Sequence, residues 1–234
     1  MAIESTRSAK MNAIDLVPRQ SSRRSHAVYV ALQKEIVLGD LRPEGALTEL
    51  DLAERFHCSQ STVREALMQL SEEGLVKRLP HRGTHVAPCR ERDARALLSI
   101  RKGLECDHLA AVVARATPQI DATLHDHLNA MRNAARDGDE YLLSVHDRAF
   151  HADLFAVAAL PLLEPILARC LIHNHRFKIL NSQPHRGLEE TAERHAPIVE
   201  AVLARSTARL RELLGHHIAT IVDFGPDLTG VEKA

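Results

Sequence analysis

Apolar residues recur every three or four positions along most of this chain, which is the spacing expected of amphipathic helices. Within residues 47–83 this spacing occurs twice in quick succession. It predicts one short helix that ends near Phe56, and a second that runs from about Gln60 to Glu73 with Ser59 as its N-cap. The few residues between the two helices allow only a turn. The apolar stripe of the second helix leaves its polar residues on the opposite face or at its amino-terminal end.

A polar β-hairpin is expected to follow the second helix. Gly74 ends that helix, and two short strands are predicted at 75–79 and 84–86, with a turn at 80–83. Two helices joined by a tight turn and followed by a hairpin form a winged helix-turn-helix, whose second helix fits the major groove of B-DNA. An ordinary helical hairpin is a commoner source of the helical pattern, but the glycine-containing wing argues against it.

The remainder of the chain shows helical spacing only. Apolar stripes cover 93–116, 119–137, 139–157, 161–180, 188–205 and 206–223, with glycines and prolines mainly at the junctions. The fold class is therefore predicted as mainly α, with a carboxy-terminal all-α bundle of six or seven helices. The expected segments are a flexible tail at 1–25, a winged helix-turn-helix at 26–88, a helical domain at 89–226 and a second tail at 227–234. The first tail is either disordered or a basic arm that touches DNA phosphates.

Composition limits the class of protein. The 234 residues carry a formal net charge of −1, so DNA binding would depend on the local placement of arginine and lysine rather than on bulk charge. The four cysteines lack CxxC spacing and suit free thiols in a reducing cytoplasm. We find no segment apolar and long enough to span a membrane, and no signal-peptide core at the amino terminus. We therefore expect a cytoplasmic protein that does not bind membranes.

Four residues of the helical region form a candidate metal site. Asp147 and His151 lie at i and i+4 on one helix face, while His195 and His217 belong to the last two apolar stripes. Three imidazoles and one carboxylate suit a divalent transition metal, with zinc favoured and nickel or manganese as alternatives. Because the chain has 15 histidines, ordinary packing or surface placement is the competing interpretation. His216 competes with His217, which we prefer because it continues the apolar stripe of its helix.

The chain resembles a known family in both regions. The runs VREAL and EEGLV and the RG turn of the wing are similar to the DNA-binding domain of GntR-family transcription regulators. The DxxxH motif, followed by one histidine in each of the last two stripes, resembles the metal-binding FCD ligand domain of the FadR subfamily. The resemblance implies a homodimeric regulator of double-stranded operator DNA, a repressor by default, that responds to a small carboxylic acid bound at the metal.

The resemblance also implies roles for individual residues. Arg64 is the best candidate for operator contact, since arginine can bond guanine O6 and N7 together. Gln60 stands where many family members have arginine and would favour adenine. The full set of candidate DNA contacts comprises polar residues of the second helix and the wing: Gln60, Thr62, Arg64, Lys77, Arg78, Arg82 and Gly83. Thr62, Lys77 and Arg78 are assigned to phosphates and the wing tip to the minor groove. Each charged side chain could instead be solvated surface.

Arg101 is the candidate ligand-binding residue, because it matches a family arginine that faces the pocket and can hold a carboxylate bidentately. A helix-surface ion pair with Glu105 at i+4 is the alternative. His173 or His175 could also line the pocket. A metal-dependent hydrolase and an effector-independent architectural DNA-binding protein are the competing functions. The chain lacks an HExxH motif and a free carboxylate clearly placed beside the candidate metal ligands, so we do not expect the protein to be an enzyme.

Overall fold

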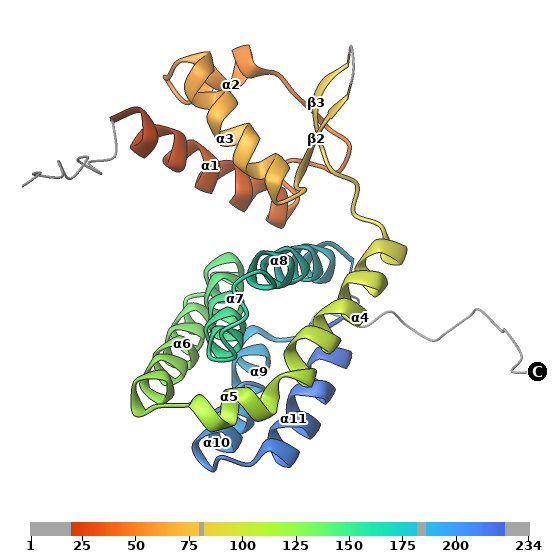
Figure 1. The fold of residues 1–234 in the computed structure, drawn as a ribbon. Coiled ribbons are helices and arrows are strands. Elements are labelled where there is room, and N and C mark those ends of the chain that lie inside the picture. Colours follow the sequence, from red (N-terminus) through yellow and green to blue (C-terminus); the bar gives the residue numbers. More distant parts are fainter. Residues whose placement is uncertain (1–19, 80–81, 182–185, 223–234) are drawn as a thin grey trace, which may run out of the picture.

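The computed structural model describes residues 20–79, 82–181 and 186–222 and divides into two parts (Figure 1). The first part is a winged helix-turn-helix, here called the reader domain (residues 20–86). The second is an all-α bundle, here called the bundle, made of α4 to α11. The predicted fold class is therefore confirmed. Most of the expected tail at 1–25 and all of the tail at 227–234 lie outside the described residues.

The reader domain contains three helices and a three-stranded antiparallel sheet. Its elements are α1 (Gln20–Leu38), β1 (Ala46–Leu47), α2 (Glu49–Arg55), α3 (Gln60–Glu72), β2 (Val76–Leu79) and β3 (Gly83–Val86). The first helix begins at Gln20 rather than at the expected boundary of His26. The Ser59 hydroxyl caps α3 as predicted, because it accepts a hydrogen bond from the Thr62 backbone N–H at 3.2 Å.

The strand β1 has no counterpart among the elements predicted from sequence. It pairs with the wing strand β3, Ala46 opposite His85, so that the strand order is β1-β3-β2. A two-residue strand is too short to produce an alternating pattern, which explains why sequence did not show it. The turn before it places Glu44 at φ +65°, a left-handed conformation usually taken by glycine, while the neighbouring Gly45 lies outside that region.

The core of the reader domain joins α1 and α3. Leu32 and Ile36 of α1 are fully buried against Val63 and Leu70 of α3. Leu50, Leu52, Ala53 and Phe56 have the spacing of one apolar stripe, but Leu50 is 52% exposed; Leu52 and Ala53 are buried, and Phe56 packs partly buried on the core. Two bundle residues, Tyr141 and Ile172, complete this core and attach the reader domain to the bundle.

The bundle follows the predicted order of helices with two of the expected stripes interrupted. Its helices are α4 (Glu91–Asp107), α5 (Leu109–Arg115), α6 (Pro118–Arg136), α7 (Glu140–Ala156), α8 (Glu164–Asn181), α9 (Leu188–Glu193), α10 (Ala196–Leu203) and α11 (Thr207–Ala219). The stripe at 93–116 breaks at His108, and that at 188–205 breaks at Arg194 and His195. No described helix is long and apolar enough to cross a bilayer.

The helices α7 and α8 lie between the reader domain and the rest of the bundle (Figure 1). Phe150 of α7 is fully buried, together with Leu124 and Met131 of α6 and Leu214 of α11. The helix α7 thus has one face in the bundle core, while Tyr141 near its start reaches the reader domain. This arrangement puts residues of α7 and α8 within reach of both parts.

Candidate metal centre and DNA-binding surface

The four predicted metal ligands meet at one point inside the bundle. Asp147 and His151 come from α7, His195 is the N-cap of α10, and His217 comes from α11. All four are buried, and one donor atom from each lies within 4.8 Å of those of the others. The described residues contain no other group of three or more such side chains that meets this geometry. Surface placement, one of the two competing interpretations, is therefore not what the structure shows.

The spacing of the donor atoms fits a single small ion. The two Nε2 atoms of His151 and His217 are 3.2 Å apart, and Asp147 Oδ2 is 3.5 Å from His195 Nε2. The other carboxylate oxygen, Asp147 Oδ1, is 3.6 Å from His151 Nε2. Neighbouring ligands of tetrahedral zinc, with bonds of about 2.0–2.1 Å, lie roughly 3.3 Å apart. Three of the donor pairs thus have nearly the separation that a bound zinc requires, and all four donors lie within 4.8 Å of one another.

Hydrogen bonds on the far side of two rings orient Nε2 towards the centre. His151 Nδ1 lies 2.5 Å from Glu105 Oε2, and His195 Nδ1 lies 3.2 Å from the carbonyl oxygens of Thr191 and Ala192. Oxygen atoms of these kinds accept, so each Nδ1 carries the proton and each Nε2 presents its lone pair. A carboxylate or carbonyl behind a ligating histidine is the usual support of a metal site.

Burial sets the protonation states that metal binding needs. Desolvation lowers the pKa of His151 and lowers that of His217 well below its ordinary value, so both rings are neutral near pH 7. Burial by itself would raise the pKa of Asp147, but the adjacent imidazoles of His175 and His195 lower it well below the ordinary range. An ionised carboxylate and neutral imidazoles are the ligating forms, so Asp147, His151 and His217 are already in the forms that bind a metal.

Glu105 supports the cluster from behind, whereas the sequence indicated it only as a possible surface partner of Arg101. The structure confirms the pair, with Arg101 Nε donating to Glu105 Oε1 at 2.6 Å, but both side chains are buried. The surface alternative was therefore wrong. Glu105 lies on α4, 46 residues from His151, so only the packing of α4 on the rest of the bundle brings them together. The Nη1 and Nη2 atoms of Arg101 are buried without a hydrogen-bond partner among the described residues.

Among the remaining histidines that the structure describes, His175 lies next to the centre. Its Nε2 lies 3.2 Å from Asp147 Oδ1, and it is almost fully buried. His173 instead points to the reader domain, where its Nε2 lies 2.9 Å from the Glu73 carbonyl oxygen. His216 is exposed whereas His217 is buried, in agreement with the preference for His217.

Replacing Glu105 by glutamine should weaken metal binding about 10- to 100-fold, the usual effect of removing a supporting carboxylate. The amide keeps the shape of the side chain but is a poorer acceptor for His151 Nδ1–H. Competition for zinc with a chromophoric chelator would measure the affinity, and Glu212→Gln, an exposed acid on α11, is the matched control. Circular dichroism would show that the variant is folded. An unchanged zinc affinity would contradict the supporting role of Glu105.

The predicted DNA-binding residues mostly lie on the outer surface of α3 and the wing. The side chain of Arg64 is 56% exposed, and its Nη2 lies 2.7 Å from Glu49 Oε2. Arg78 Nη2 lies 3.2 Å from the other oxygen of the same carboxylate. Hydrogen bonding to Arg64 and the charge of Arg78 lower the pKa of Glu49. One carboxylate of α2 therefore holds two arginines, one from α3 and one from β2, beside each other on the surface.

The other candidate contacts divide into exposed and buried residues. Gln60, Lys77, Arg82 and Gly83 are exposed, as a DNA contact requires. Thr62 is not, because it is only 5% exposed and its hydroxyl lies 2.8 Å from Ser59 Oγ. The assignment of Thr62 to a phosphate was thus wrong, and its role is to complete the N-terminal cap of α3. Of the wing turn at 80–83, residues 80–81 lie outside the described residues.

A winged helix-turn-helix with an outward arginine-bearing helix, joined to a separate helical bundle, is the architecture of a DNA-binding transcription regulator. Residues 24–86 match the family model "Bacterial regulatory proteins, gntR family", and residues 96–220 match the FCD domain. The chain therefore belongs to the GntR family of transcription regulators, in the FadR-like subfamily that carries an FCD domain.

Curated relatives and solved structures agree with this assignment. The chain is 28% identical over 202 residues to the uncharacterized HTH-type regulator BphR of Paraburkholderia xenovorans, covering 84% of this chain and 82% of that one. It is 29% identical over 201 residues to the repressor GlaR of Escherichia coli, covering 82% and 91%. The solved structure of E. coli McbR/YncC matches with a TM-score of 0.70 at 23% identity, covering 84% and 94%, which supports the fold. The family and these relatives are regulators rather than enzymes.

Proposed function

We propose that this regulator is a cytoplasmic, homodimeric repressor whose affinity for operator DNA is controlled by a small organic acid bound at a metal centre in the bundle. The observation that carries the proposal is the buried cluster of Asp147, His151, His195 and His217, whose donor atoms have the separations of a metal site. The proposed division of labour places DNA binding in residues 26–88 and sensing in 89–226. Pro88 and Cys89 link β3 to α4 at that boundary.

The four clustered side chains would hold a divalent metal, with zinc preferred over nickel or manganese for a set of three imidazoles and one carboxylate. When bound, the metal supplies a Lewis-acidic position at which a carboxylate oxygen of the effector can bind. The protein contributes a buried setting for the four donors, ring orientations fixed through Glu105 and the Thr191 carbonyl, and a neutral His151 imidazole.

Arg101 supports an acid as the effector class. Its guanidinium is fully buried and uses Nε for Glu105, while Nη1 and Nη2 have no hydrogen-bond partner among the described residues. Buried donors without partners are costly, by about 1–3 kcal/mol each. A carboxylate of the effector bound beside Arg101 would satisfy both donors in the fork geometry that guanidinium prefers.

The exposed residues of α3 and the wing support binding to operator DNA. We propose that Arg64 and Gln60 reach base edges in the major groove. Lys77 and Arg78 of β2 would contact phosphates, and Arg82 with Gly83 would enter the minor groove at the wing tip. Glu49 would keep Arg64 and Arg78 extended in the free protein and release them to the duplex.

Exposed apolar side chains support dimerisation through the bundle. Leu162, just before α8, is 88% exposed, while Ile166 of α8 and Ile100 of α4 are close to half exposed. The helices α4 and α8 pack against each other, so these side chains belong to neighbouring elements. A second copy would cover such apolar surface and set the spacing of two reader domains on a palindromic site. Repression follows the relatives that are themselves described as repressors.

Lys77→Ala should weaken binding to every duplex by a similar factor and reduce the slope of log K against log[salt] by about 1 for each phosphate that is no longer neutralised. The reason is that a phosphate contact releases counterions without reading sequence. The measurement is fluorescence anisotropy, at several salt concentrations, on a selected operator and on a scrambled duplex. Lys102→Ala, on α4 of the bundle, is the matched control. A weakening confined to the operator would show instead that Lys77 reads bases.

The decisive experiment for the proposed function is metal analysis of purified protein, followed by a thermal-shift screen of small mono- and dicarboxylic acids. We expect a stoichiometric divalent metal, and a rise in melting temperature with an acid only when the metal is present. A bundle that binds neither would favour an effector-independent architectural protein. Turnover of an ester or amide that disappears in His151→Ala would favour a metal-dependent hydrolase.

A further inference from the structure

The helix α8 contacts the metal-site carboxylate with one face and the reader domain with the other. Residues three and four apart on a helix share a face. The residues of α8 that contact the reader domain or the linker follow this spacing: Arg169, Ile172, His173, Arg176 and Leu180. Between them, His175 faces the bundle interior and lies 3.2 Å from Asp147 Oδ1. One rigid element therefore touches both functional sites.

On the metal side, His175 fixes the carboxylate of Asp147. The Nε2 of His175 lies near Oδ1, whereas His195 Nε2 lies 3.5 Å from Oδ2. The contact between His175 Nε2 and Asp147 Oδ1 is an ion-pair contact without the geometry of a hydrogen bond, while Oδ2 lies on the side of His195. His175 thus holds the orientation of a ligand without being one of the four convergent donors.

On the DNA side, α8 holds the end of the recognition helix α3. The Glu73 carbonyl at the C-cap of α3 accepts a hydrogen bond from His173 Nε2 at 2.9 Å. The Arg169 guanidinium covers the next residue so closely that a Cβ placed on Gly74 would clash with it. Carbonyl groups at a helix end lack internal partners and carry negative partial charge, so both contacts are favourable.

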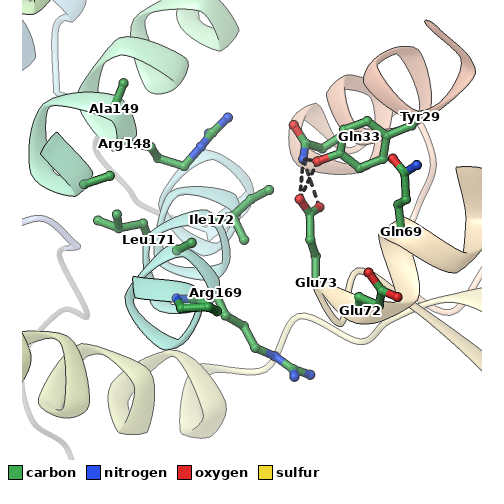
Figure 2. Close-up of a pocket in the computed structure, with 13 residues that line it drawn as sticks. Tyr29, Gln33, Gln69, Glu72, Glu73, Arg148, Ala149, Arg169, Leu171 and Ile172 are labelled. Atoms are coloured by element: carbon green, nitrogen blue, oxygen red, sulfur yellow. Dashed lines mark hydrogen bonds between the residues drawn. The ribbon is translucent and has the colours of Figure 1, made fainter. Parts of the chain in front are cut away.

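The linker between the two parts is held by the same helix. Arg176 is fully buried and donates from Nη2 to the Ala87 carbonyl at 2.8 Å, directly after the wing strand. A cleft of about 510 Å³ lies beside these contacts, lined by residues of α1, α3, α7 and α8. Elsewhere α1 packs directly on α7 and α8, where Tyr141 and Ile172 enter the core of the reader domain. Figure 2 shows Glu73, Tyr29 and Gln33 bonded to one another on the reader side, facing Arg148 and Ile172 of the bundle across this cleft. The end of α3 is therefore positioned by a small number of specific contacts, several of them from α8.

We propose that α8 relays the state of the metal centre to the recognition helix, with His175 as the positioning residue for Asp147 and His173 as the positioning residue for the end of α3. The inference rests on the proposed metal centre. When Asp147 is ordered at the centre, the contacting His175 moves and shifts α8. His173 lies two residues away on the same helix, so its hydrogen bond to the Glu73 carbonyl changes with that shift. Two sites become coupled when both bias one element that has two arrangements.

The metal side is tested by His175→Ala and His175→Gln in the full chain, with zinc as the probe. A glutamine amide nitrogen can replace Nε2 as the polar contact of Oδ1 but is a poor zinc ligand. We expect alanine to weaken zinc binding about 10- to 100-fold and glutamine to restore most of it. Equal weakening in both variants would show that His175 is itself a ligand and overturn its positioning role, as would an unchanged affinity in both.

The coupling is tested by hydrogen exchange of the metal-free full chain before and after zinc addition. In the wild type we expect slower exchange in α7 and α11 and also, by roughly fivefold or more, in peptides that cover the end of α3 at 69–75. In His173→Ala the effect in α7 and α11 should remain while that at 69–75 disappears. His173→Gln, which keeps a donor for the Glu73 carbonyl, should restore it, and His125→Ala on the exposed face of α6 should match the wild type.

The outcomes separate the two proposals. Zinc-dependent protection in α7 and α11 without any change at 69–75 of the wild type would overturn the relay and leave the metal centre standing. A change at 69–75 that survives in His173→Ala would also overturn it. The absence of zinc binding to the wild type would refute the metal centre, and the relay would fall with it.

Discussion

Replacing His151 by alanine should strip the purified protein of its divalent metal. His151 is fully buried, lies 3.2 Å from His217 across the cluster, and is held by Glu105 from behind. Its removal takes away one of four converging donors and leaves Glu105 without its imidazole partner. We expect metal content, measured by inductively coupled plasma mass spectrometry, to fall from stoichiometric to near zero. The stabilisation that a bound metal gives, about 2.7 kcal/mol at 100 times its dissociation constant, should disappear with it.

The histidine pair on α11 supplies the matched control for this effect. His217→Ala should behave as His151→Ala does, while His216→Ala, one residue away but exposed, should retain metal and acid response. Since a buried histidine also contributes to packing, both core variants need a circular dichroism spectrum and a melting curve without metal. Unchanged metal content in folded His151→Ala and His217→Ala protein would show that the four-residue assignment is wrong.

Replacing Arg64 by alanine should abolish specific operator binding and leave metal content intact. A bidentate contact between arginine and guanine discriminates by about 5- to 150-fold, and in a dimer the substitution removes it from both half-sites. Because the Arg64 side chain is more than half exposed and its partner Glu49 is at the surface, the fold should tolerate the change. Anisotropy titrations with the selected operator and a scrambled duplex would separate specific from nonspecific binding.

The control for this variant is Arg209→Ala on α11. Arg209 is an exposed arginine of similar environment, paired with Glu212 at 2.9 Å, but it lies in the bundle. Operator binding that is equal in Arg64→Ala and the wild type would show that Arg64 does not read bases. Together, the His151 and Arg64 variants should show opposite defects, in metal content for one and in operator binding for the other. That pattern would establish that sensing and reading reside in separate parts.

Several features of the site could be inferred from the sequence because they depend on local spacing. Asp147 and His151 lie one helical turn apart, so a helix alone puts them on one face. The choice of His217 over His216 followed from the apolar stripe of its helix, and the structure buries the former and exposes the latter. The Ser59 cap and the exposed position of Arg64 on α3 follow from the same helical geometry.

Other features depend on contacts between segments that are distant along the chain. Glu105 looked like a surface partner of Arg101, because i+4 spacing says nothing about which face is covered; the packing of the bundle buries both. Thr62 looked like a phosphate contact, but the turn before α3 folds its hydroxyl onto Ser59. Leu50 fitted an apolar stripe that the short helix α2 does not bury. The strand β1 forms only because the wing strand β3 lies beside it.

The sequence by itself indicated the two-part architecture and the second helix of the helix-turn-helix, because periodicity is a property of a single segment, and its resemblance to a known family singled out the four clustered donors. Only the tertiary structure decided that these donors converge, that Glu105 and His175 support them, and that α8 touches both the cluster and the end of α3. Those facts depend on which faces of different helices meet. Side-chain burial and hydrogen bonding between helices determine which faces pack together, and the sequence pattern of a single helix does not show this.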